Sequence, residues 1–381
     1  MKDLNFAGAV LRMLRLERQW SQETLCQGIC NVSYLSKIEQ GRVQPNEDLL
    51  KALFGRLDIP WQEATEDQGR GICEKLYELV FADEEEGIQQ SKELGILRQE
   101  GAAMGLYYLD YLILRTYCCK EKNLIPDNLM GLLDNRQKGL LYLAQNSPSE
   151  ALQCYPCALT AKMAGVDAYR SKNYTRAMEL LQQGYDMASQ QGYARIMLFC
   201  RIYMANCCSE MQNVPNMLAH YTIAKRLAQA LGEQNLLRTI EYNIASTYVE
   251  CGYYQEGYEY FSNLEKLSVL DAHKLAICCE KLNRPVEALT MLNIVRDEAQ
   301  GIQAKMCDLV RFRLKNKHYL QEDEYGTLLL ETFQEIRRSM PLGFARFHLP
   351  WVEEWYTANR QYRAAYELIR DFSSSRENHS L

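Results

Sequence analysis

Small, polar and aromatic side chains near the N-terminus have the chemistry needed to contact the edges of DNA bases. Hydroxyl, ammonium and apolar groups at the start of a helix can hydrogen-bond to or pack against base edges in the major groove. The preceding helix is expected to begin with Gln22, whose amide can donate a hydrogen bond to a phosphate oxygen. The predicted DNA contacts are Gln22, Val32, Ser33, Tyr34, Ser36 and Lys37.

Helix signals on either side of these residues predict four short helices that position them. Polar N-caps, a left-handed glycine and apolar residues at helical spacing are the signals used. The expected signals are an N-cap at Ser21, a turn at Cys30-Asn31, a helix end at Gly41, and an N-cap at Asn46 with the fourth helix ending before Pro60. The expected inward-facing residues are Phe6, Val10, Leu11, Leu14, Leu25, Ile29, Leu35, Ile38, Leu49, Leu50, Leu53 and Leu57.

The first 60 residues also resemble a known family. The pattern Gly8, Leu11, Arg12, Leu14, Arg15, then SQETL and GIC…SYLSKIEQG…P is similar to the Xre/Cro-type helix-turn-helix. The GIC variant is especially similar to the peptide-pheromone receptors of the Rgg and PlcR type. The resemblance implies that Arg15 pairs with Glu39 and thereby holds the third helix on the first. It therefore assigns these two residues a structural role and not a base-reading one.

A spacing pattern of small and large residues recurs after the first domain. A small residue is followed twelve positions later by another and four further on by a large apolar or aromatic one. The pattern fits Gly139–Ala151–Tyr155, Gly165–Ala177–Leu181 and Ala276–Ala288–Leu292, and more loosely Ala205–Met217–Tyr221 and Ala245–Gly257–Phe261. Second helices are expected to open at Pro148, Tyr174, Tyr254, Pro285 and Tyr362.

These segments resemble degenerate tetratricopeptide repeats. Steps of 40 residues separate Ala177, Met217 and Gly257, and residues 296–350 fit no clean repeat. We expect an all-α chain, with an N-terminal helix-turn-helix domain and then a superhelical array of at least five helical pairs. The predicted divisions are a DNA-binding domain at 1–61, a linker at 62–71, a repeat domain for peptide sensing and dimerisation at 72–372, and a flexible tail at 373–381.

The first helix of each pair should line a concave surface suited to an extended peptide. In the repeat register Asn206 and Ser246 are equivalent inward positions, and Asn243 lies beside them. An Asn side chain can donate to and accept from a peptide backbone at once, and Asn residues here are characteristic of the family resembled above. The predicted peptide-binding residues are Lys162, Tyr169, Asn206, Tyr242, Asn243, Ser246 and His273.

The charge distribution bears on how such a chain could hold DNA. The formal net charge is −6, and residues 1–60 contain 8 Lys and Arg against 7 Asp and Glu. The reading domain is thus only mildly basic, so a single copy would bind phosphates weakly. A homodimer is therefore expected on double-stranded DNA.

Several other classes are disfavoured. No Gly-rich phosphate loop, HExxH or GxSxG pattern occurs, and the five histidines are dispersed, so no enzyme and no cofactor are expected. Cys154 and Cys157 form a lone CxxC without nearby histidines, which disfavours a metal site, and the 14 cysteines indicate a reducing compartment. No apolar run is long enough to span a membrane, and a cytoplasmic protein is expected.

The favoured hypothesis is a dimeric transcription regulator of a quorum-sensing kind, whose repeats bind a short signalling peptide that modulates DNA binding. One alternative is a scaffold that holds a protein partner in its repeats, with the helix-turn-helix as a tether. Another is a phage-type lysis–lysogeny peptide receptor with the same architecture. The residues alone leave open the operator, the sign of regulation and the identity of the peptide.

Overall fold

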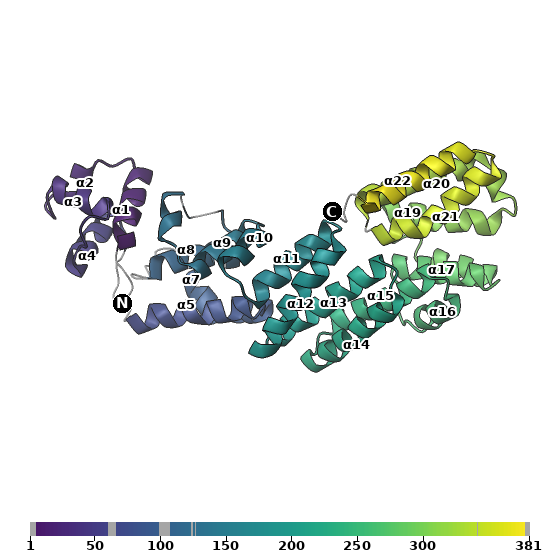
Figure 1. The fold of residues 1–381 in the computed structure, drawn as a ribbon, viewed down its shortest axis with the longest axis horizontal. Helices are drawn as coiled ribbons and strands as arrows, with labels where there is room; N and C mark the ends of the chain where they lie inside the picture. Colours follow the sequence, from purple (N-terminus) through teal and green to yellow (C-terminus); the bar gives the residue numbers. More distant parts are fainter. Residues whose placement is uncertain are drawn as a thin grey trace. The chain divides into compact units, whose positions relative to one another are not determined.

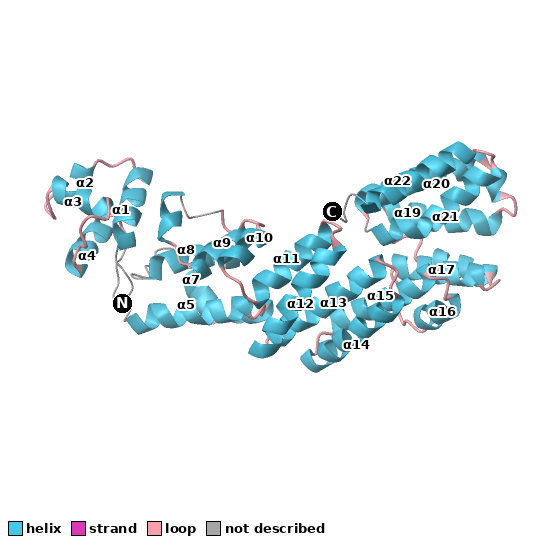
Figure 2. Ribbon diagram, viewed as in Figure 1, coloured by secondary structure: helices cyan, strands magenta, loops and turns pink. Residues whose placement is uncertain are grey.

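The computed structural model describes residues 5–59, 66–98, 107–122, 125, 127–340 and 342–377. Over these ranges every regular element is a helix and none is a strand (Figure 2). The predicted all-α class is therefore confirmed. The sequence explains it, because only 9 prolines and 21 glycines interrupt 381 residues.

Four short helices form the N-terminal domain, drawn in purple in Figure 1. They are α1 (Asn5–Glu17), α2 (Gln22–Cys26), α3 (Val32–Glu39) and α4 (Glu47–Arg56). Each contributes a fully buried leucine to one core, namely Leu11, Leu25, Leu35 and Leu53. Gly41 has φ +69°, the left-handed conformation expected after the third helix.

A set of shorter helices follows. These are α5 (Glu66–Phe81), α6 (Glu85–Gln90), α7 (Lys92–Leu97), α8 (Tyr108–Cys118) and the 3₁₀ helix η2 (Asp127–Leu132). Tyr77 of α5 is buried and donates from its hydroxyl to Asp110 of α8 at 3.0 Å, and Gln137 donates to the same carboxylate at 2.9 Å. Asp110, which is 1% exposed, therefore receives hydrogen bonds from two neighbours within its core.

Helical pairs then succeed one another to the end of the described chain. They are α9 (Asn135–Ala144) and α10 (Pro148–Cys154), α11 (Ala158–Arg170) and α12 (Tyr174–Gln191), α13 (Ala194–Glu210) and α14 (Val214–Leu231), α15 (Gln234–Glu250) and α16 (Tyr254–Ser262), α17 (Val269–Lys281) and α18 (Pro285–Ile294), α19 (Gly301–Lys315) and α20 (Asp323–Ser339), and α21 (Leu342–Ala358) and α22 (Tyr362–Glu377), with the short η3 (Tyr319–Gln321) before α20. Five second helices begin at the residues predicted for them, Pro148, Tyr174, Tyr254, Pro285 and Tyr362.

The small residues of the repeat pattern allow the helices of a pair to approach closely. A Cβ atom added to Gly139 would lie 2.7 Å from Tyr155 Cβ, and one added to Gly165 would lie 2.7 Å from Leu181 Cγ. Replacing either glycine with a residue that has a Cβ atom would force the paired helices apart. The predicted packing of a small residue against a large one is present in both pairs.

Residues 296–350, which fit no clean repeat in the sequence, also form helices that pack in pairs. α20 and α21 approach each other closely, because a Cβ atom added to Gly326 of α20 would lie 2.1 Å from Trp355 Cζ2 of α21. Pro350 lies inside α21, which is one reason the segment does not resemble a regular repeat.

Two boundaries of the predicted division differ from the described helices. α5 begins at Glu66, so residues 66–71 of the predicted linker 62–71 are helical, while 60–65 lie outside the described residues. α22 continues to Glu377 into the predicted tail 373–381, because no proline or glycine interrupts residues 362–377. The domain boundaries themselves stay predictions.

Contacts divide the chain into two compact units. Unit 1 comprises Met1–Asp167 with Glu179–Met197, and unit 2 comprises Ala168–Met178 with Leu198–Leu381. The N-terminal domain belongs to unit 1. The pockets described below belong to unit 2.

Candidate functional site

Side-chain caps start both helices of the N-terminal pair. Ser21 Oγ accepts a hydrogen bond from the Thr24 backbone N–H at 3.0 Å, and Asn31 Oδ1 accepts from that of Tyr34 at 2.7 Å. The turn between the helices lies earlier than predicted, because α2 ends at Cys26 and Gly28 has φ +73°. Asn31 is thus the N-cap of α3 and not part of a turn at Cys30-Asn31.

The predicted base-reading residues lie at the start of α3 and along its outer side. Val32, Ser33 and Lys37 are exposed, with Val32 at 41%. Tyr34 and Ser36 are half-buried. The opposite face of α3 packs inward through Leu35 and Ile38. Ile29, which the sequence predicts to face inward from the second helix, is half-buried and lies beyond the end of α2. The helix therefore presents these five residues away from its own core.

Arg15 of α1 and Glu39 of α3 form a two-point ion pair. Arg15 Nε donates to Glu39 Oε1 at 2.7 Å and its Nη2 donates to Oε2 at 2.8 Å. Both side chains are buried, and Glu39 raises the pKa of Arg15 through its hydrogen bond. The contact holds the third helix on the first.

Gln22 joins the same carboxylate. Its Nε2 donates to Glu39 Oε2 at 2.8 Å. This amide nitrogen therefore supports the contact between α1 and α3, and a phosphate contact from Gln22 stays a prediction.

One pocket of unit 2 brings together five of the seven predicted peptide-binding residues. We call it the asparagine pocket; its volume is about 230 Å³. Its lining comes from α11, α13, α14, α15 and α21. The five predicted residues that line it are Tyr169, Asn206, Tyr242, Asn243 and Ser246.

Hydrogen bonds hold the two asparagines side by side. Asn243 Nδ2 donates to Asn206 Oδ1 at 3.5 Å, and the Tyr221 hydroxyl donates to the same oxygen. Over the described residues, Asn206 Nδ2 and Asn243 Oδ1 make no hydrogen bond. The amide nitrogen of Asn206 and the amide oxygen of Asn243 are thus left for the pocket, and a peptide unit can accept from the first and donate to the second.

The other two predicted peptide-binding residues do not line this pocket. Lys162 belongs to unit 1, where its Nζ donates to Asp83 Oδ2 at 2.6 Å. His273 of α17 is 1% exposed and stacks on His348 of α21, with ring centroids 5.8 Å apart. His273 was assigned to an inward surface from the repeat register, but α21 covers it.

The asparagine pocket also contains residues that the sequence analysis did not single out. Glu210 and Glu250 are the last residues of α13 and α15, and Gly343 and Phe344 come from α21. The two glutamates are 40 residues apart, the same step that separates Ala205 from Ala245, so the repeat period could have revealed them. No local signal pointed to Gly343 and Phe344.

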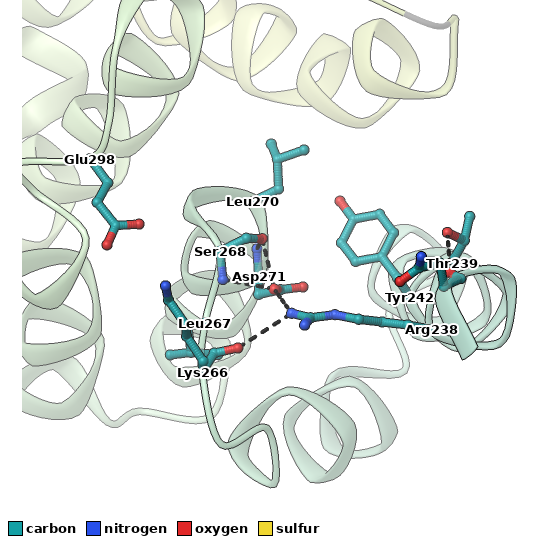
Figure 3. Close-up of a pocket in the computed structure, with 10 residues that line it drawn as sticks. Arg238, Thr239, Tyr242, Lys266, Leu267, Ser268, Leu270, Asp271 and Glu298 are labelled. Atoms are coloured by element: carbon teal, nitrogen blue, oxygen red, sulfur yellow. Dashed lines mark hydrogen bonds and ion pairs between the residues drawn. The ribbon is translucent and has the colours of Figure 1, made fainter. Parts of the chain in front are cut away.

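A second pocket of unit 2, of about 570 Å³, shares Tyr242 with the first. We call it the Arg238 pocket. Figure 3 shows Arg238 reaching across it toward Asp271 and the carbonyl of Lys266, with Glu298 on the far side. The remaining lining residues are Asn235, Thr239, Leu267, Ser268 and Leu270.

Among the residues that the structure describes, no group of three or more His, Cys, Asp or Glu side chains could hold a metal ion. No helix in the same ranges is both long and apolar enough to cross a membrane.

Comparison with known proteins assigns the first domain. Residues 7–61 match the family model described as a helix-turn-helix domain. The N-terminal domain is a helix-turn-helix domain. The match agrees with the two capped helices, α2 and α3, and with the ion pair that joins α3 to α1.

A curated relative and two solved structures extend the comparison. The transcriptional activator NprA of Geobacillus stearothermophilus is 23% identical over 260 residues, which cover 58% of this chain and 62% of that protein. A Rap protein complexed with competence and sporulation factor has a TM-score of 0.55 at 16% identity, covering 83% of this chain and 99% of that one. PlcR of Bacillus thuringiensis, in complex with the peptide PapR7 and DNA, has 15% identity over 75% of this chain and 99% of that one. Its TM-score of 0.20 is too low to support an argument.

The domain match confirms the helix-turn-helix expected from the sequence. The Rap structure supports the fold of the helical pairs. The alignment with NprA covers less than two thirds of that relative.

Proposed function

We propose that this chain is a DNA-binding transcriptional regulator whose helical pairs bind a short signalling peptide that modulates DNA binding. The helix-turn-helix domain supports the DNA partner. The curated relative, itself a transcriptional activator, supports the regulatory role. The Rap structure, which shares the fold of the helical pairs, was solved in complex with competence and sporulation factor. An enzymatic role and a cofactor form no part of the proposal.

The observation that carries the peptide proposal is the pair Asn206 and Asn243. The two amides lie side by side in a pocket and retain one donor and one acceptor between them. A peptide backbone offers the matching acceptor and donor whatever its side chains are. The pocket is therefore suited to a peptide in extended conformation.

We also propose a homodimer on DNA and a cytoplasmic location. The first 60 residues carry almost no net charge, so two reading domains are needed to contact enough phosphates for useful affinity. A ligand would act through different affinities for two arrangements of the dimer.

The test combines DNA and peptide binding by the full chain. DNA sites would first be selected from random duplexes, and their affinities measured by fluorescence anisotropy at several salt concentrations. Synthetic peptides encoded by small reading frames beside the gene would then be titrated. A peptide that binds and shifts the DNA affinity supports the regulator. DNA binding that no such peptide changes would favour the scaffold alternative, and absence of sequence-selective DNA binding would contradict the regulator itself.

A further inference from the structure

Along one face of α15 the side chains change from basic at one end, through polar, to acidic at the other. Arg238, Tyr242, Ser246 and Glu250 are each four residues apart, so they lie on successive turns of the same face. Arg238 lines the Arg238 pocket, Ser246 and Glu250 line the asparagine pocket, and Tyr242 lines both. The two pockets are therefore neighbours along a single helix.

The end of this face at Glu250 is acidic. Glu250 and Glu210 both line the asparagine pocket, and no lysine or arginine is among its described lining residues. The two carboxylates converge on Gly343, because a Cβ at that position would lie 3.4 Å from Glu210 Oε1 and 3.6 Å from Glu250 Oε2. Burial raises the pKa of Glu210, Arg346 lowers it, and Glu250 raises it.

The cations that pair with these glutamates approach from outside the pocket lining. Lys274 donates to Glu250 Oε1 at 3.0 Å and its side chain is 0% exposed. Arg346 reaches Glu210 Oε2 only at 3.5 Å, the long limit of a hydrogen bond. A cationic group entering the pocket could therefore make a shorter contact with Glu210 than Arg346 does.

The end of the face at Arg238 carries two cations, Arg238 and Lys266, beside the carboxylates of Asp271 and Glu298, and Arg238 is loosely held. The Arg238 side chain is 58% exposed, and its contacts with the Lys266 carbonyl and Asp271 Oδ2 are long, at 3.3 and 3.4 Å. Asp271 Oδ2 already accepts from the backbone N–H and the hydroxyl of Ser268, at 2.8 and 2.7 Å. Arg238 can therefore turn toward an incoming anion at small cost, and Lys266 lines the same pocket.

Between the two ends lies a polar group without a partner. The Tyr242 hydroxyl is buried and makes no hydrogen bond within ordinary geometric limits to any described residue. Burial also raises the pKa of Tyr242, so the hydroxyl stays protonated and able to donate. A buried donor of this kind is costly unless a ligand satisfies it.

Resting on the proposed function, we propose that the two pockets form one groove that binds a short peptide in a single direction. The free N-terminal ammonium lies at Glu210 and Glu250, the backbone crosses Asn206, Asn243 and Tyr242, and the C-terminal carboxylate lies at Arg238 and Lys266. The peptide thus runs antiparallel to α15. The reverse direction would place a carboxylate between two glutamates, where like charges repel.

Helix geometry also sets the length of the ligand. Twelve residues of α15 separate Arg238 from Glu250, which is about 18 Å at the rise of an α-helix. An extended chain covers about 3.3 Å per residue. The groove therefore fits a peptide of about five or six residues with both ends free.

The test uses the full-length protein and pools of random hexapeptides in three forms: free ends, acetylated N-terminus, and amidated C-terminus. Bound peptides are recovered by size exclusion and identified by mass spectrometry, and the strongest binder is then measured by calorimetry in all three forms. Because one charge-assisted hydrogen bond is lost in each case, we expect either modification to weaken binding by about 10- to 100-fold.

Two variants assign each end. With Glu210→Gln, acetylation should cost little further affinity while amidation still does; with Arg238→Gln, the pattern should reverse. Arg226→Gln, an exposed arginine on α14 outside both pockets, is the matched control and should behave as the wild type. Because Arg238 is exposed, its variant should fold even if Glu210→Gln does not.

The outcomes separate the two proposals. Peptides that bind equally well with blocked ends, or whose end effects map to the opposite variants, overturn the direction while leaving a peptide receptor in place. If no form of the pool and no candidate peptide binds, the peptide-receptor function fails as well.

Discussion

Gly8 of α1 lies directly against the backbone carbonyl of Ile38 in α3: a Cβ atom on Gly8 would be 1.9 Å from that oxygen. Because the obstacle is backbone, it cannot swing aside as a side chain could. Gly8→Ala should therefore displace α3 and destabilise the helix-turn-helix domain by about 1–3 kcal/mol or more. Hydrogen exchange of α1 and α3 in the full chain measures this.

Gly55→Ala is the control for that experiment. Gly55 lies in α4 of the same domain, and nothing lies within 4 Å of a Cβ added there. Alanine is the better helix former, so this change should stabilise α4 by up to about 1 kcal/mol. Equal protection in the two variants would contradict the close packing of α1 on α3.

A second prediction concerns the outer side of α3. Lys37→Ala should weaken binding to all DNA sequences alike and lower the salt slope by about 1, as for one lost phosphate contact. Tyr34→Ala should instead relax selectivity by about 1–3 kcal/mol at one base position. Anisotropy on selected and scrambled duplexes distinguishes them. Lys75→Ala, on α5, is the charge control. If it weakened DNA binding as much as Lys37→Ala does, Lys37 of α3 would not be a DNA contact.

A third prediction tests the asparagine pair. Asn243→Ala removes both the contact to Asn206 and the acceptor left for a ligand, so peptide affinity should fall by about 1–3 kcal/mol while DNA affinity without peptide stays unchanged. Calorimetry with the strongest hexapeptide binder measures the loss. Asn293→Ala, at an exposed position of α18, is the matched control. Unaltered peptide affinity in Asn243→Ala would exclude that amide from the site.

A fourth prediction concerns acid stability. Burial lowers the pKa of His348 to about 3 and that of His273 well below 6.5, and neighbouring Lys274 and Arg313 lower both further. The folded chain therefore binds fewer protons than the unfolded chain below pH 6.5, and stability falls as the pH drops from 6.5 toward 3. Each histidine contributes a slope of about 1.4 kcal/mol per pH unit in that range.

Denaturant unfolding of the full chain, followed by tryptophan fluorescence between pH 7 and pH 4, checks the slope. His273→Leu should make it shallower by the share of one histidine, and the exposed His318→Gln should leave it as in the wild type. A slope that does not change in His273→Leu would mean that this imidazole is protonated in the folded chain.

Local signals were enough to predict the helix-turn-helix and most of the helical pairs. The N-caps Ser21 and Asn46 act within three residues, and the small-to-large pattern acts within one pair. Contacts over long sequence distances could not be predicted in the same way. Glu210 contacts Arg346, which lies 136 residues later in the sequence, and α21, the helix that contains Arg346, follows no repeat pattern.

The two predicted peptide-binding residues that do not line the asparagine pocket were chosen for the same reason. The repeat register predicted which face of its own helix His273 or Lys162 occupies. It did not predict which other residues pack against that face. His273 is covered by His348 of α21, and Lys162 forms an ion pair with Asp83, the first of a run of acidic residues that follows α5. The register brought five of the predicted residues together in the asparagine pocket because they lie on neighbouring first helices, and their role in binding a peptide stays a prediction.

Glu39 is the point at which the first three helices meet, since Arg15 of α1 and Gln22 of α2 both donate to its carboxylate. These hydrogen bonds hold α3 in a fixed position relative to α1 and α2. Any signal that reaches the domain must act on all three helices as one rigid body, by tilting or shifting them together. Under the proposed function, a bound peptide would therefore change where α1, α2 and α3 lie together on the duplex and leave the local shape of α3 unchanged.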